Sequence, residues 1–288
     1  MNKKHMLPLF TAFLCWGSTY IVFKIALETV PPVTLLLCRY LVAVPTLLIV
    51  LKLRGALKPM KRESVGVILT IGFVGYFASF CIQMLGINRL SSSVSSLLGA
   101  MHPIFIPLLA TVFLKEKLSM GRILSIAVSM AGVAVIVGVS GTADLLGVLM
   151  MLLSVFLWSG ASIIIRRISG QYDPMQIAMM AIFCAIPFVG AWSVLELQTN
   201  TVSFPMASVL SILYMGTIGM AVPHSLWNYC LSKMDASICS MFYPMQPLVS
   251  ATLGVLILGE SITVNYVAGS VIICCGIVGA VYTGMRKK

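Results

Sequence analysis

Two short polar segments inside long apolar stretches have the residue types that bind a small polar molecule. His102 is followed by Pro103, and Gln246 is followed by Pro247, 144 positions further along the chain. Because proline lacks a backbone N–H and disturbs the carbonyl one turn earlier, Pro103 and Pro247 predict kinked helices with free carbonyls beside a polar side chain. The sequence therefore predicts one binding point in each half of the chain. Helix bending for packing alone is the alternative.

Further polar and aromatic side chains recur at helical spacings on these predicted helices and on others. Aromatic stripes of this kind usually serve packing, and Trp227 with Asn228 can equally form an anchor at the membrane surface. Trp16 has a partner in Trp158, 142 positions on, which also suits shared architecture. The candidate substrate-binding residues are Trp16, Tyr20, Arg39, Tyr76, Gln83, His102, Trp227, Asn228, Tyr243 and Gln246.

The charged residues inside the apolar stretches are cations. Lys24 and Arg39 lie within such stretches, whereas all eight carboxylates lie at their ends or between them. A site of positive character suits a substrate carboxylate or phosphate, and the lack of a buried carboxylate argues against proton-coupled export of cationic drugs. Two alternatives remain: Lys24 can pair with Glu28 one turn later, and both cations can extend to the membrane surface.

Two histidines, His102 and His224, lie deep enough in apolar stretches to make proton coupling one interpretation. A hydrogen-bonded packing role is the other. Facilitated exit of a substrate down its gradient needs no coupling group, and it agrees better with the missing carboxylates.

The composition excludes a soluble domain. Hydrophobic residues make up 59% of the 288 positions and charged residues only 9%, against about 25% charged residues in soluble proteins. The net charge of +11 comes from basic residues between apolar stretches, which is a membrane-orientation pattern and not a nucleic-acid-binding one. The eight cysteines show no metal-ligand spacing and there is no phosphate-binding loop, so neither a metal nor a cofactor is expected.

The chain is expected to be an all-α membrane protein with ten transmembrane helices, since about 20 apolar residues cross a bilayer. Sixteen of the 19 basic residues fall on one side of these helices and one on the other, so both termini are expected in the cytoplasm. The first span lacks a convincing cleavage site, so no cleavable signal peptide is expected. The predicted spans are 6–26, 33–53, 64–84, 92–114, 121–139, 145–166, 174–196, 208–229, 236–258 and 264–284.

An internal duplication organises these spans. An offset of 144 pairs Gly72 with Gly216 and Glu116 with Glu260, among others. Because each repeat has five spans, an odd number, the second copy must cross the membrane in the opposite direction. The sequence predicts two inverted five-helix repeats, 1–141 and 142–288, which is how many transporters build two access states around a central site.

Several short motifs resemble the EamA-type transporters of the drug/metabolite transporter superfamily. They are Trp16-Gly-Ser with Trp158-Ser-Gly, Leu114-Lys-Glu116 with Leu258-Gly-Glu260, and Arg39-Tyr40. Lys115 departs from the pattern, because many members have a small residue there. The resemblance covers nearly the whole chain and implies a transporter in the inner membrane, with amino acids, sugars, nucleotides, cofactors or drugs as possible cargo.

The leading hypothesis is export of amino acids or related carboxylate-bearing metabolites by alternating access. Drugs, nucleosides or sugars are the alternative cargo. Two remote alternatives are a membrane scaffold and an intramembrane serine protease using Ser140 of Gly138-Val-Ser140-Gly141 with His224. The expected partners are a small-molecule substrate and the lipid bilayer, not nucleic acid. Small residues such as Gly132 and Gly276 predict close helix contacts, within one chain or in a homodimer, so a monomer and a homodimer both remain open.

Overall fold

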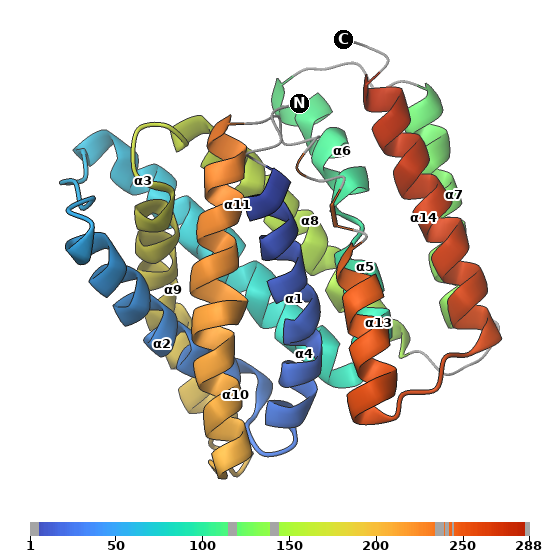
Figure 1. The fold of residues 1–288 in the computed structure, drawn as a ribbon, viewed down its shortest axis with the longest axis horizontal. Coiled ribbons are helices and arrows are strands. Elements are labelled where there is room, and N and C mark those ends of the chain that lie inside the picture. The colour runs from blue at the N-terminus through green and yellow to red at the C-terminus, as the bar shows by residue number, and fades with distance from the viewer. Residues whose placement is uncertain are drawn as a thin grey trace.

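The computed structural model describes residues 6–114, 120–138, 144–233, 239, 242–243 and 245–285. These residues form a bundle of helices that run between two ends of the molecule (Figure 1). Six helical stretches are long and apolar enough to cross a membrane, and four further apolar helices are shorter. The described part of the chain contains one isolated bridge, between Ser169 and Tyr172, and no sheet.

The helices of the first half begin where sequence signals allow. Pro32 opens the second helix, at a position whose N–H would have no helical partner in any case. The elements are α1 (Met6–Leu27), α2 (Pro32–Leu53), α3 (Arg62–Thr70), the π-helical segment η2 (Ile71–Ser79), α4 (Phe80–Arg89), α5 (Ser92–Gly99), α6 (His102–Leu114) and α7 (Met120–Gly138).

The second half follows the same plan. The carboxylates of Asp144 and Asp173 cap the first turns of two of its helices by accepting backbone N–H groups. Its elements are α8 (Leu145–Ile168), α9 (Pro174–Glu196), α10 (Met206–Gly216), the π-helical segment η3 (Thr217–Ala221), α11 (Val222–Lys233), α13 (Met245–Leu258) and α14 (Val264–Met285).

The two prolines predicted to kink their helices do not lie inside continuous helices. The predicted span 92–114 is divided at residues 100–101, and Pro103 follows in the first turn of α6. Pro247 likewise lies in the first turn of α13. The physical reason is that the first turn of a helix has backbone N–H groups without helical partners, so proline costs little there.

Two predicted spans contain π-helical turns that the sequence did not indicate. The span predicted at 64–84 runs continuously from Arg62 to Arg89 and widens over η2, and the span predicted at 208–229 runs from Met206 to Lys233 and widens over η3. With the offset of 144, η3 corresponds to residues 73–77, which lie within η2. Such widened turns often occur at functional sites.

Helices from the two halves pack against one another throughout the bundle. α2 packs on α9, α5 on α13, α1 on α11, and α4 and η2 on α8. The pair α7 and α14 lies together at one side of the molecule (Figure 1). The small residues predicted to allow close contact are used between these two helices: Gly132 faces the Gly269 carbonyl, and Gly276 faces Ser129.

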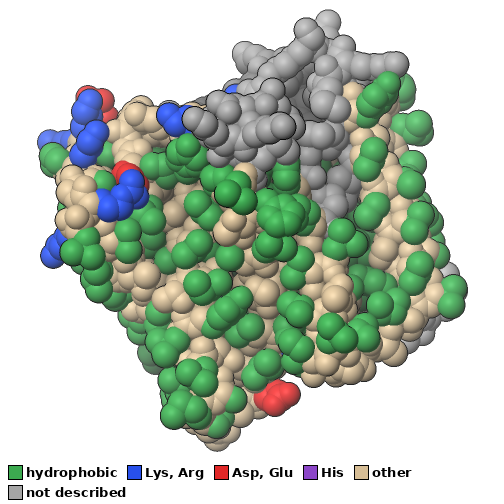
Figure 2. Space-filling view, viewed as in Figure 1, with side chains coloured by type: hydrophobic (Ala, Val, Ile, Leu, Met, Phe, Trp, Pro, Cys, Tyr) green, Lys and Arg blue, Asp and Glu red, His purple; other side chains and the backbone are tan. Residues whose placement is uncertain are grey.

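The outer surface is largely apolar, as a bilayer requires. Figure 2 shows hydrophobic side chains over most of the visible described surface, with Lys and Arg gathered toward its upper left. Large exposed hydrophobic residues occur on almost every long helix, for example Leu7, Leu53, Leu153 and Val271. The chain is therefore a multi-pass membrane protein. The residues 115–119 and 139–143, which contain Lys115, Glu116 and Ser140, lie outside the described part.

Candidate functional site

A cavity lies at the centre of the bundle, where helices of both halves meet. It leaves a free volume of about 50 Å³ for water-sized molecules, which is room for one or two waters. A larger molecule fits only if the lining helices or side chains separate. The lining residues are Trp16, Thr19, Tyr20, Phe23, Arg39, Ser79, Phe80, Gln83, Gly99, His102, Ser154, Val155, Trp158, Gly219, His224, Tyr243 and Gln246.

Arg39, on α2, is the charged residue of this cavity and is only 1% exposed. Its Nη1 and Nη2 atoms lie 3.8 Å and 3.4 Å from the sulfur atoms of Met84 and Met220, and its Cζ atom lies 4.6 Å from the centre of the Phe23 ring. Its Nε atom has no hydrogen-bond partner. Thioether sulfur is a weak acceptor, so the guanidinium is held in place without a strong anionic acceptor.

Within the described residues, the ion pairs join Arg54 to Asp173 and Arg89 to Asp144, and neither involves Arg39. The described structure also shows no ion pair between Lys24 and Glu28, one alternative that the sequence left open. An unpaired buried charge is costly in the apolar interior of a membrane protein. The arrangement around Arg39 therefore suits an anionic group supplied by a ligand.

His224, on α11, lies in a ring of aromatic side chains beside this cation. Its ring centre is 5.1 Å from that of Trp158, 5.2 Å from Trp16 and 5.5 Å from Phe80. Its Nδ1 atom is 3.3 Å from the hydroxyl of Tyr76, whereas its Nε2 atom has no partner. The cavity thus combines an apolar aromatic wall with polar atoms that remain available to a ligand.

The other wall carries the two predicted binding points. The Nδ1 atom of His102 is 2.9 Å from the Ser159 hydroxyl, and its ring centre is 4.2 Å from that of Tyr243. Gln246 is 4% exposed and lines the same cavity. Gly99 lies directly against the Tyr20 hydroxyl, where any Cβ atom would collide with it. Glycine is therefore needed at this position for the tyrosine to reach the cavity.

Seven of the ten predicted binding residues border the cavity, and Tyr76, Trp227 and Asn228 do not. Tyr76 lies behind its wall, stacked on Phe80 and bonded to His224. Trp227 is fully buried against other aromatic rings, and the Asn228 side chain donates to the Pro174 carbonyl at 3.2 Å. These burials argue against the interfacial anchor that the sequence left open for Trp227 and Asn228.

Several lining residues were absent from the predicted set, notably Trp158, His224, Ser79 and Ser154. The internal duplication could have indicated two of them, Trp158 and His224. Trp158 is the partner of Trp16 at an offset of 142, and His224 is the partner of Phe80 at an offset of 144. The two serines carried no such signal.

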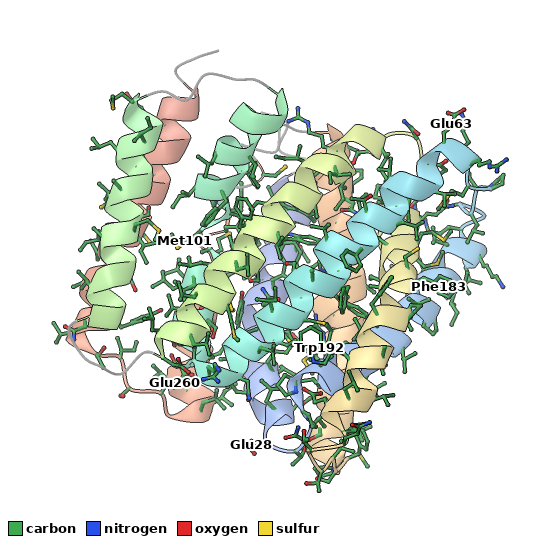
Figure 3. All side chains as sticks on the ribbon, turned by 180° about the vertical axis from the view of Figure 1, so that it is seen from behind. Glu28, Glu63, Met101, Phe183, Trp192 and Glu260 are labelled. Atoms are coloured by element: carbon green, nitrogen blue, oxygen red, sulfur yellow. The ribbon has the colours of Figure 1, made fainter. Side chains whose placement is uncertain are left out.

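A hydrogen-bonded contact closes the end of the bundle where Glu260 lies, opposite to the end that carries Glu63 (Figure 3). The Glu260 carboxylate accepts the backbone N–H and hydroxyl of Ser92 at 2.7 Å each, and those of Ser93 at 3.2 Å and 2.6 Å. Partial burial would raise the pKa of Glu260, but these hydrogen bonds outweigh it and hold that pKa below its ordinary value. The contact joins the α13–α14 connection to the start of α5.

Known proteins resemble this chain along its whole length. The model of the EamA-like transporter family matches residues 3–138 and again residues 145–282. An uncharacterized transporter of Archaeoglobus fulgidus is 25% identical over 289 residues, covering all of both chains. A probable amino-acid metabolite efflux pump of Salmonella typhimurium is 24% identical, with 96% of this chain and 94% of the relative covered. A probable amino-acid metabolite efflux pump of Escherichia coli is also 24% identical, with 100% of this chain and 98% of the relative covered.

The fold has also been solved for another protein. One crystal structure superimposes with a TM-score of 0.70 over all of both chains, at 18% sequence identity. At that identity the likeness concerns the fold alone.

Proposed function

The chain belongs to the EamA-like transporter family, and we propose that it exports amino acids or related carboxylate-bearing metabolites through its central cavity. Two relatives named as probable amino-acid metabolite efflux pumps support this substrate class. The family and its relatives are transporters and not enzymes. Export of drugs, nucleosides or sugars by the same fold is the alternative.

The observation that carries the proposal is the unpaired Arg39 guanidinium at the cavity. A carboxylate is a planar anion that accepts two parallel hydrogen bonds from a guanidinium, and such a pair is strong and directional. Arg39 would bind the substrate carboxylate and release the methionine sulfurs that now contact it. Among the residues that the structure describes, the cavity lining contains no Asp or Glu that would repel this anion.

The remaining predicted residues have complementary roles in this proposal. His102, Tyr243 and Gln246 would donate and accept hydrogen bonds from one wall, and Trp16 with Tyr20 would form the apolar surface. Tyr76 would act by positioning His224, to which it is bonded. Gln83 would contact the substrate from α4, whereas Trp227 and Asn228 would close the cavity on the side toward the end of α11.

Transport by alternating access follows from a further proposal, that ten membrane helices form two inverted five-helix repeats, 1–141 and 142–288. Three observations support it: the family model matches the chain twice, both third spans widen at equivalent positions, and the helix contacts keep their pattern when the halves are exchanged. For example, α1 packs on α11 in the same way as α8, its counterpart in the second repeat, packs on α4 and η2, the counterparts of α11 in the first repeat. A cavity of about 50 Å³ is too small for an amino acid, so these helices must separate to admit one.

The orientation proposed from the sequence places both termini in the cytoplasm. In Figure 1, α1 begins and α14 ends toward the same upper end of the bundle. Arg54, Lys58 and Lys233 border one cavity at one end, whereas Arg89, in the last turn of α4, pairs with Asp144. This distribution supports a cytoplasmic basic end, as the positive-inside tendency requires.

Counterflow in proteoliposomes tests the proposed substrate class. Vesicles that contain the purified protein are loaded with a pool of amino acids, and single labelled compounds are offered outside with no ion gradient imposed. Exchange of one or a few amino acids supports the proposal. Exchange confined to nucleosides, sugars or cationic drugs would keep the transporter family but overturn the carboxylate argument.

A further inference from the structure

A second and larger cavity lies at one end of the bundle, separate from the central one. Its free volume for water-sized molecules is about 640 Å³, within the range of small-molecule sites. We call it the basic vestibule. It is lined by Pro8, Arg54, Ala56, Lys58, Gly170, Gln171, Tyr172, Asp173, Pro174, Met175, Ser225, Leu226, Tyr229, Ser232 and Lys233. These residues come from the start of α1, the segment after α2, the α8–α9 connection, the start of α9, and α11.

The vestibule has an excess of positive charge among its described residues. Three cations line it, and Asp173 is its single carboxylate. One oxygen of Asp173 accepts the Met175 N–H at 2.9 Å as the cap of α9, and the other is 3.8 Å from Arg54. Lys58 and Lys233 therefore form no ion pair in the part of the chain that the structure describes. Both lysines are exposed.

Helix α11 connects the basic vestibule with the central cavity. His224 lines the central cavity, and the next residue, Ser225, lines the vestibule. Trp227, three residues after His224 on α11, is fully buried, with its ring centre 5.5 Å from that of Tyr243 and 6.0 Å from that of Phe13. The Nε1 atom of Trp227 and the Oδ1 atom of Asn228 have no partners. The two cavities thus share helix α11 as a common wall.

We propose that the basic vestibule captures the anionic group, a carboxylate or phosphate, of the substrate before the substrate passes to Arg39 in the central cavity. The identification of the ligand as the transported substrate rests on the proposed function. Anion binding itself rests on the vestibule alone. The headgroup of an acidic phospholipid has the same chemistry, and the test below separates a lipid from a soluble ligand.

The expected effect is on capture and not on the translocation step. Exposed charges raise the local concentration of an oppositely charged ligand, and salt screens them over about 10 Å at 0.1 M ionic strength. Removing Lys58 and Lys233 together should raise KM for an anionic substrate about fivefold at low salt, with kcat unchanged, and have little effect at 1 M salt.

Lysine labelling with mass-spectrometric detection tests anion binding without any transport assay. The full-length protein in nanodiscs of neutral phosphatidylcholine is treated with an amine-acylating reagent, with and without 10 mM inorganic phosphate or a mixed amino-acid pool. We expect at least twofold protection of Lys58 and Lys233 by either probe. Lys52, which is exposed on α2 and does not line the vestibule, serves as the control and should not change.

Each outcome of this test decides the proposal. Equal labelling with and without both probes overturns anion binding. Protection only in nanodiscs with phosphatidylglycerol, and by no soluble probe, overturns substrate capture and assigns the site to a lipid headgroup. Protection by phosphate in a protein that exchanges no carboxylate would leave the anion site standing while the proposed function fails.

Transport kinetics then connect the site to function. The double variant Lys58→Gln/Lys233→Gln is compared with Lys52→Gln in counterflow at low and high salt. A salt-dependent rise in KM confined to the double variant supports capture. An unchanged KM at low salt in the correctly folded double variant refutes it.

Discussion

Replacing Glu260 by glutamine should destabilise the protein by an amount set by its four hydrogen bonds. Both carboxylate oxygens accept from Ser92 and Ser93 at the start of α5. Glutamine keeps one acceptor oxygen and presents an NH₂ group to donors that need an acceptor. Two charge-assisted bonds are lost, each worth about 1.5–3 kcal/mol when well shielded. Because Glu260 is only partly buried, we take the low end and discount it to about 1–2 kcal/mol in total.

The chain contains its own reporter for this measurement. Cys81, Cys230 and Cys239 have buried thiols, so a thiol-reactive dye reports unfolding when heat exposes them. A change of about 1–2 kcal/mol corresponds to a Tm decrease of roughly 2–5 °C for a chain of this size. Glu28→Gln at the same end is the control, because Glu28 is exposed and its removal should leave Tm nearly unchanged.

The pH dependence gives a second check with a defined sign. The pKa of Glu260 in the folded protein lies below its ordinary value, so its contribution is complete above the ordinary carboxyl range. The contribution is lost as the pH falls through the lower folded value. The Tm difference between wild type and Glu260→Gln should therefore be constant from pH 6 to 8 and disappear in acid. Equal Tm values at pH 7, or a difference that persists in acid, would refute this reasoning.

Two further predictions concern the cavity and the helix contacts around it. His102→Ala and Gln246→Ala should each lower counterflow at least tenfold while the thiol-dye Tm stays near that of wild type, and full activity in both variants would contradict the site assignment. Gly216→Ala should cost about 1–3 kcal/mol and lower the Tm, because the new Cβ would lie 2.5 Å from that of Val42. Gly66→Ala, where a Cβ meets nothing within 4 Å, is the matched control and should not lower the Tm.

The sequence predicted the helical class and most span positions because hydrophobic length and basic-residue placement are strong signals in membrane proteins. It placed Pro103 and Pro247 inside continuous helices. The structure begins a new helix at each proline, an outcome that depends on whether neighbouring helices tolerate a break. The π-helical turns η2 and η3 had no signal in the sequence, because a single added residue per turn leaves the apolar composition unchanged.

The sequence predicted only part of the candidate site. A charge inside an apolar stretch indicated Arg39, and helical spacing indicated the polar faces that contain His102 and Gln246; the structure places all three at one cavity. Helical spacing indicates which residues of one helix share a face. It does not indicate which face a neighbouring helix covers. Trp227 is therefore covered by Phe13 and Tyr243, while His224, one turn earlier, reaches the cavity.

The most direct test of the account is counterflow of one amino acid and its uncharged amide by wild type and Arg39→Gln. The account predicts that wild type exchanges the carboxylate and discriminates against the amide, because a buried polar group left unpaired costs about 1–3 kcal/mol. Arg39→Gln should lose that discrimination along with at least tenfold of carboxylate exchange, while its Tm shows that it is folded. Exchange of the carboxylate by folded Arg39→Gln at the wild-type rate would contradict the central claim.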